Sequence, residues 1–192
     1  MENDKTDVPK PSVYRMMHPR LTIMVTSVDK EGTPNIITLA WSMITSFKPL
    51  MLAISVSPDR YSHGLIKESG EFTVNIPTMD ILKETLLCGR VSGREYDKFK
   101  ITGLIPEPAE NVKPPLIKEC IAHLECRVKD TMKTGDHTIF AGEILRAIAS
   151  RKSFNEKYDI GTTNLIYHLG KNDFTTNQKD VITPNWRDLL PK

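Results

Sequence analysis

The stretch Gly32–His63, GTPNIITLAWSMITSFKPLMLAISVSPDRYSH, sets two apolar strands beside a short polar cluster. The residues Gly32–Asn35 predict a tight turn, because glycine tolerates a positive φ and proline fixes its own. The β-branched and apolar run 36–41 then predicts one strand, and the run 50–56 predicts a second. This part of the chain therefore indicates a β-rich fold.

The second of these strands runs into Ser57–His63, SPDRYSH. Two hydroxyls, at Ser57 and Ser62, flank Arg60, whose guanidinium matches phosphate through paired N–H donors. A helix beginning near Tyr61 would add its free N–H groups to the same site. The alternative is a surface turn in which Ser62 caps that helix. We favour the first interpretation, which predicts a phosphate-bearing cofactor.

Composition indicates one soluble globular domain. The chain has 192 residues, of which 39% are hydrophobic and 26% charged. Its formal net charge is only +2 and the basic residues are scattered, which argues against a nucleic-acid partner. No apolar run has the length that a membrane span needs. We therefore expect a soluble protein that acts on small ligands.

Two further features predict a cytoplasmic location. The N-terminal stretch MENDKTDVPKPS is charged and lacks the apolar segment of a signal peptide. Three cysteines, Cys88, Cys120 and Cys126, cannot all pair with one another and show no disulfide spacing. A reducing compartment is the simplest expectation.

The remaining pattern predicts several strands and few helices. Strands are expected over 21–28, 122–131 and 138–149, a short amphipathic helix over 79–88 ended by Gly89, and an irregular loop over 105–115. Residues Gly135-Asp136 connect the last two strands as an antiparallel hairpin. Without a βαβ rhythm, this order favours a barrel or a sandwich.

A metal site in Cys120-x2-His123-x2-Cys126 is not favoured. In the expected strand, Ala122, Leu124, Cys126 and Val128 share the inner face, whereas His123, Glu125, Arg127 and Lys129 share the outer face. Cys126 and His123 then point in opposite directions and cannot share a tetrahedral site. A buried structural Cys126 is predicted, and no metal is assigned.

Several short motifs, taken in order, resemble the flavin reductase-like family. They are the GxPN turn, the Ala-Trp-Ser strand, the Lys-Pro-Leu step, SPxRYS, GEFTVNIP (70–77), DKF (97–99), ECRV (125–128), GDHTIFAGEI (135–144) and YHLG (167–170). No single motif is specific, but the occurrence of all of them in this order over residues 15 to 170 is specific. The flavoredoxins and the archaeal ferric reductases are the most similar in style.

The resemblance implies a mainly β fold, a Greek-key split barrel that binds FMN. It implies a domain over 14–170, preceded by an arm over 1–13. A tail over 171–192 follows, and its apolar residues Phe174, Trp186, Leu189 and Leu190 are expected to dock on the body or on a partner subunit. A homodimer with the flavin near its interface is also implied.

The resemblance also implies which residues bind FMN. The segment 40–45 would lie along the isoalloxazine and present backbone N–H groups and hydroxyls to its polar edge, through Ala40, Trp41, Ser42, Met43 and Thr45. From the residues alone, a core strand with satisfied hydroxyls is favoured, and the resemblance reverses that. The phosphate would be held by Ser57, Arg60, Ser62, His63 and Lys98, although a solvated lysine is the usual alternative.

His137, in Gly135-Asp136-His137, resembles the family motif at the nicotinamide donor. We expect it to position NADH or NADPH against the flavin, since hydride transfer needs stacking and little acid–base help. A turn histidine beside an Asx turn is the alternative. The resulting prediction is an FMN-dependent oxidoreductase acting on flavin, ferric or protein acceptors. Its rivals are a pure electron carrier and a non-catalytic flavin-binding module.

Overall fold

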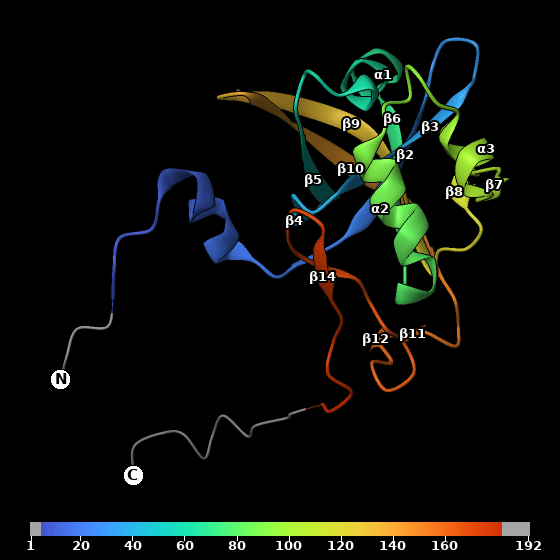
Figure 1. Cartoon of the computed structure of the whole chain (residues 1–192). Helices are drawn as coiled ribbons and strands as arrows, with labels where there is room; N and C mark the ends of the chain where they lie inside the picture. Colours follow the sequence, from blue (N-terminus) through green and yellow to red (C-terminus); the bar gives the residue numbers. More distant parts are fainter. Residues whose placement is uncertain (1–4, 182–192) are drawn as a thin grey trace.

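The computed structural model describes residues 5–181, and seven strands of this part form one antiparallel sheet (Figure 1). The sheet has the order β3-β2-β6-β9-β10-β5-β4. Its strands are β2 (Ile23–Val28), β3 (Pro34–Leu39), β4 (Ser42–Phe47), β5 (Leu50–Val56), β6 (Glu71–Ile76), β9 (Ala122–Thr134) and β10 (His137–Ala149). Because β5 pairs with β10 and not with β6, the chain crosses over in a Greek-key manner.

The sheet curls into a barrel that stays split between its two edge strands. Near the split, the Ser55 N–H donates to the Trp41 carbonyl at 3.0 Å. The β2–β3 hairpin begins with a hydrogen bond from the Asp29 N–H to the Thr33 carbonyl. Backbone hydrogen bonds alternate along the two strands from this point, so Asn35, Ile37 and Leu39 form them with β2. The backbone groups of Ile36 and Thr38 therefore face the free edge of β3.

Three helices cover this free edge and one end of the barrel. They are α1 (Tyr61–Ser69), α2 (Leu82–Arg90) and α3 (Lys98–Thr102). The start of α1 agrees with the sequence prediction, but α2 continues past Gly89. A Cβ at Gly89 would lie 3.2 Å from the Thr38 Cβ. Gly89 thus permits the close approach of α2 to β3 and does not end the helix.

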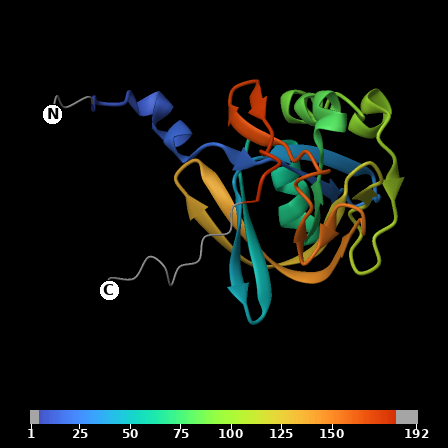
Figure 2. The ribbon, with the colours of Figure 1, turned by 90° about the horizontal axis from the view of Figure 1, so that it is seen from below.

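Short elements complete the chain. They are η1 (Lys10–Met17), β1 (Arg20–Leu21), η2 (Met79–Ile81), β7 (Pro106–Glu107), β8 (Leu116–Ile117), β11 (Phe154–Asn155), β12 (Lys157–Tyr158), β13 (Tyr167–Gly170) and β14 (Asp173–Thr175). Figures 1 and 2 show η1 lying apart from the barrel. The β1, β13 and β14 strands form a small sheet that brings both ends of the domain together.

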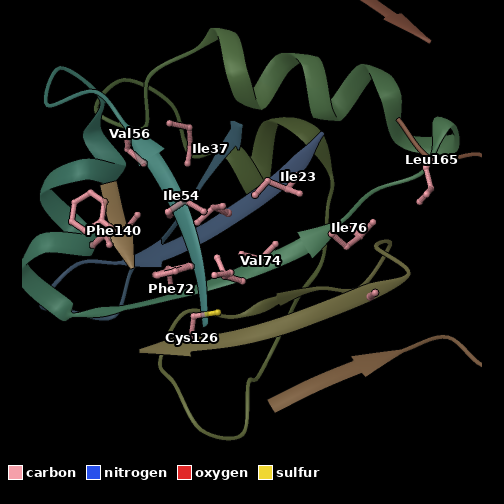
Figure 3. Packing of buried hydrophobic residues seen from close by; sticks show 14 residues of the cluster. Ile23, Ile37, Ile54, Val56, Phe72, Val74, Ile76, Cys126, Phe140 and Leu165 are labelled. Atoms are coloured by element: carbon pink, nitrogen blue, oxygen red, sulfur yellow. The ribbon is translucent and has the colours of Figure 1, made fainter. Parts of the chain in front are cut away.

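The barrel interior holds the main hydrophobic core (Figure 3). Phe72 and Phe140 are fully buried there, and Cys126 is buried as predicted. A second cluster, which includes Met24, Ile36, Cys88 and Phe99, packs outside β2 and β3. Both faces of β2 are consequently buried.

The expected outer face of β9 is exposed over only part of its length. His123 and Glu125 were predicted to face outward, but they are 8% and 1% exposed. The irregular segment before β9 covers Glu125, which accepts hydrogen bonds from the backbone N–H groups of Glu110 and Asn111, and the Arg146 guanidinium of β10 also donates to it. The His123 Nδ1 atom instead lies 2.7 Å from the side-chain oxygen of Asn75 in β6. The donors to Glu125 hold its pKa below its usual value, although burial alone would raise it.

Between residues 5 and 181, no helix is both long enough and apolar enough to cross a membrane. The same residues contain no group of three or more histidine, cysteine or acidic side chains placed to hold a metal ion.

Candidate functional site

A cavity of about 870 Å³ occupies the split of the barrel. One wall is the free edge of β3 with the residues that follow it, Ile37 to Trp41, and another is the end of β5 with its following loop. The α2 helix contributes Thr85, Leu86, Gly89 and Arg90. The cavity therefore lies where Thr38 directs free backbone groups.

The β5–α1 loop places two predicted phosphate ligands on the cavity wall, Ser57 and Arg60. Arg60 directly precedes α1, whose first N–H groups have no partner within the helix. Asp59 also lines the cavity, and its backbone N–H donates to the Ser57 hydroxyl at 3.3 Å. The cavity wall thus presents a guanidinium and a hydroxyl, two groups that bind an anion, and α1 begins at the next residue, Tyr61.

Two other predicted phosphate ligands point away from the cavity. The buried Ser62 hydroxyl accepts a hydrogen bond from the Asn35 side-chain amide at 2.7 Å. The His63 Nε2 atom lies 2.9 Å from the Thr138 hydroxyl, and burial followed by the charge of Lys67 lowers the pKa of His63. Both residues connect α1 to neighbouring strands.

Lys98 lies behind the cavity wall, not on it. Lys98 is 4% exposed, and its ammonium donates to the carbonyls of Ile36 and Cys88, each at 2.7 Å. It thereby joins the free edge of β3 to α2. Burial lowers the pKa of Lys98 to about 8; the nearby Cys88 opposes the shift, and the positive charge of Arg60 adds to it.

The predicted ring-binding segment divides between two hollows. Ala40 and Trp41 line the main cavity, whereas Ser42 and Met43 line a second hollow of about 280 Å³ beside β5 and β10. Trp41 borders both hollows. Thr45 is exposed on β4 and lines neither.

His137 lines the main cavity at the start of β10. Its ring centroid lies 4.9 Å from that of Trp41, and its Nδ1 atom lies 2.8 Å from a carboxylate oxygen of Asp136. The hydrogen bond with His137 lowers the pKa of Asp136. The ring orientation of His137 is therefore fixed on two sides.

Both ends of the domain contribute cavity residues that sequence reasoning missed as site residues. These are Tyr14, His18, Thr22, His168, Lys171 and Phe174. Successive ring centroids from Phe174 through His168, His18 and Tyr14 to Trp41 are 5.1 to 6.3 Å apart. The pairing of β1 with β13 unites these segments, and His168 alone among these residues lies in a motif that the sequence analysis singled out, YHLG (167–170).

The tail predicted over 171–192 begins inside the β13–β14 hairpin. Phe174 belongs to β14 and lines the cavity, so the described part of the tail packs on its own body. Trp186, Leu189 and Leu190 lie outside the described residues.

The cavity wall has a buried hydroxyl without a hydrogen-bond partner. The buried Thr22 hydroxyl has none among the described residues, whereas the His18 ring interacts with the backbone of His168 and Leu169. Burial, followed by the charge of His168, lowers the pKa of His18. Buried unpaired polar groups are costly, so this wall fits a ligand with a polar edge.

The fold and this cavity define a split-barrel protein with a cofactor-sized site. A family model described as "Flavin reductase like domain" matches residues 14–172. An uncharacterized protein of Archaeoglobus fulgidus is 40% identical over 166 residues, which are 86% of this chain and 92% of that protein. The chain therefore belongs to the flavin reductase-like family, as its motifs predicted.

Solved structures agree with this assignment. Flavoredoxin from Methanosarcina acetivorans matches with a TM-score of 0.84 and 28% identity, over 97% of this chain and 100% of that one. An FMN-binding protein from Thermus thermophilus, solved with bound 1-cyclohex-2-enone, matches with a TM-score of 0.84 and 20% identity, over 96% and 100% of the two chains. The predicted mainly β split barrel is confirmed, and the family assigns a flavin-binding role of oxidoreductase type.

Proposed function

We propose that the cavity binds FMN, and that the chain transfers electrons from NADH or NADPH to a flavin, ferric or protein acceptor. One observation carries this proposal: a single cavity joins the Ser57–Arg60 anion cluster to the Trp41–His137 ring pair. Bound FMN supplies the hydride and single-electron chemistry, and the protein supplies binding and orientation.

The preference for FMN follows from the terminal phosphate. Ser57 and Arg60 hold that dianion by charge-assisted hydrogen bonds. The free backbone groups of Thr38, with Ala40 and Trp41, face the polar edge of the isoalloxazine. Ser62, His63 and Lys98 support these walls from behind.

His137 positions the nicotinamide beside the flavin. Its side chain is 24% exposed, and contacts to Trp41 and Asp136 hold the ring in place. A fixed ring at the cavity wall limits the orientations of a stacked donor. Correct orientation of the donor is the factor that most increases the rate of hydride transfer.

We further propose a cytoplasmic homodimer. The cysteines Cys88, Cys120 and Cys126 are free and buried, as suits a reducing compartment. Met17 and Met43 line the second hollow and are 65% and 63% exposed. Large exposed apolar side chains around an apolar hollow support a second copy on this face.

The absorption spectrum of the purified protein tests the proposal. We expect a yellow protein whose released cofactor has the mass of FMN, and whose flavin band bleaches on anaerobic addition of NADH or NADPH. FAD, haem or no cofactor after saturating reconstitution would refute FMN binding. Because flavoredoxin is a structural relative, a pure electron carrier is the second candidate. Flavin that dithionite reduces and nicotinamides do not would favour that carrier.

A further inference from the structure

The loop Ser92–Arg94 packs against the outside of the β5–α1 loop. The Arg94 guanidinium donates to the Asp59 carbonyl at 3.1 Å. Its central carbon also lies 5.4 Å from the centroid of the Tyr61 ring, within the range of a cation–π contact. Arg94 does not line the cavity, so it contacts the β5–α1 loop only on the side opposite the cavity.

Gly93 allows this approach. A Cβ there would lie 2.1 Å from the Asn35 side-chain oxygen and 2.8 Å from a Tyr61 ring carbon. The same Asn35 side chain donates to the Ser62 hydroxyl at 2.7 Å. Gly93, Asn35 and Arg94 therefore enclose the first turn of α1 on the side away from the cavity.

We propose that Arg94 is a positioning residue for the cofactor phosphate. By fixing the Asp59 carbonyl and the Tyr61 ring on either side of Arg60, it holds Arg60 in the geometry that receives the anion. A loop ordered before binding loses less entropy on binding, which strengthens affinity without a new ligand contact. This inference rests on the proposed binding of FMN.

Two substitutions separate positioning from charge. Arg94→Lys keeps the positive charge but loses the planar fork, and Arg94→Met removes both. We expect each variant of the full-length protein to bind FMN about tenfold more weakly and riboflavin less than twofold more weakly in fluorescence titrations. Arg151→Met, at an exposed turn outside both hollows, is the matched control and should change neither affinity.

A double-mutant cycle gives the sharpest test. Arg94→Met added to Arg60→Ala should weaken FMN less than twofold further, because the positioned group is already gone. Tyr61→Leu removes the ring that Arg94 contacts and should weaken FMN binding as much as Arg94→Met does. This second variant tests the inference even where Arg94→Met lowers the melting temperature. Additive losses, equal losses for both ligands, or full affinity in Arg94→Lys would each overturn the inference. A wild-type protein that binds neither flavin would instead overturn the proposed function.

Discussion

Replacing Arg60 by alanine should weaken FMN much more than riboflavin. A charge-assisted hydrogen bond contributes about 1.5–3 kcal/mol, and riboflavin has no phosphate to receive it. Arg60 is an exposed residue of the cavity wall, so solvent screening places it at the low end of that range. The expected loss for FMN is about tenfold, and for riboflavin less than twofold.

Flavin fluorescence titration at two salt concentrations measures both affinities. The ratio of the wild-type affinity for FMN to that for riboflavin should decrease as the salt concentration rises, because salt screens an exposed ion pair. Arg60→Lys should restore only part of the ratio, since lysine lacks the paired donors. If FMN and riboflavin weaken equally in Arg60→Ala, Arg60 supports the loop and does not bind the phosphate.

Local patterns predicted the elements that carry the fold. The strand over 50–56, the start of α1 and the β9–β10 hairpin depend on neighbouring residues, whose periodicity and turn chemistry are visible in the sequence. The inward face of β9 also followed from alternation, which placed Cys126 in the core.

The site was less predictable because its contacts are distant in sequence. Whether Ser62 faces a ligand or Asn35, and whether Lys98 faces a phosphate or Ile36, depends on packing between separate elements. The same holds for His18 and His168, which only the β1–β13 pairing brings together. Residue type and spacing contain no signal for such contacts.

Three further predictions concern catalysis, packing and buried charge. His137→Ala should leave FMN affinity nearly unchanged and slow anaerobic single-turnover reduction by the nicotinamide; loss of FMN instead would assign His137 to the cofactor site. Gly142→Ala should lower the free energy of unfolding by about 1–3 kcal/mol, because a Cβ would lie 2.7 Å from the buried Phe72 ring. Gly64→Ala lies in α1, and a Cβ there would have no neighbour within 4 Å, so this substitution should raise the free energy of unfolding by about 0.5–1 kcal/mol. Urea titrations of the two variants measure both changes. Finally, the pKa of Lys98 is about 8 in the folded chain against an ordinary value of 10.5, so between these values the unfolded chain binds more protons. Raising the pH through this window should therefore stabilise the wild type relative to Lys98→Met, and urea unfolding at pH 7, 8.5 and 10 measures that difference. A difference that stays constant across the three pH values would mean that the pKa of Lys98 is the same in the folded and unfolded chains, so that the Ile36 and Cys88 carbonyls fully offset the desolvation of its ammonium.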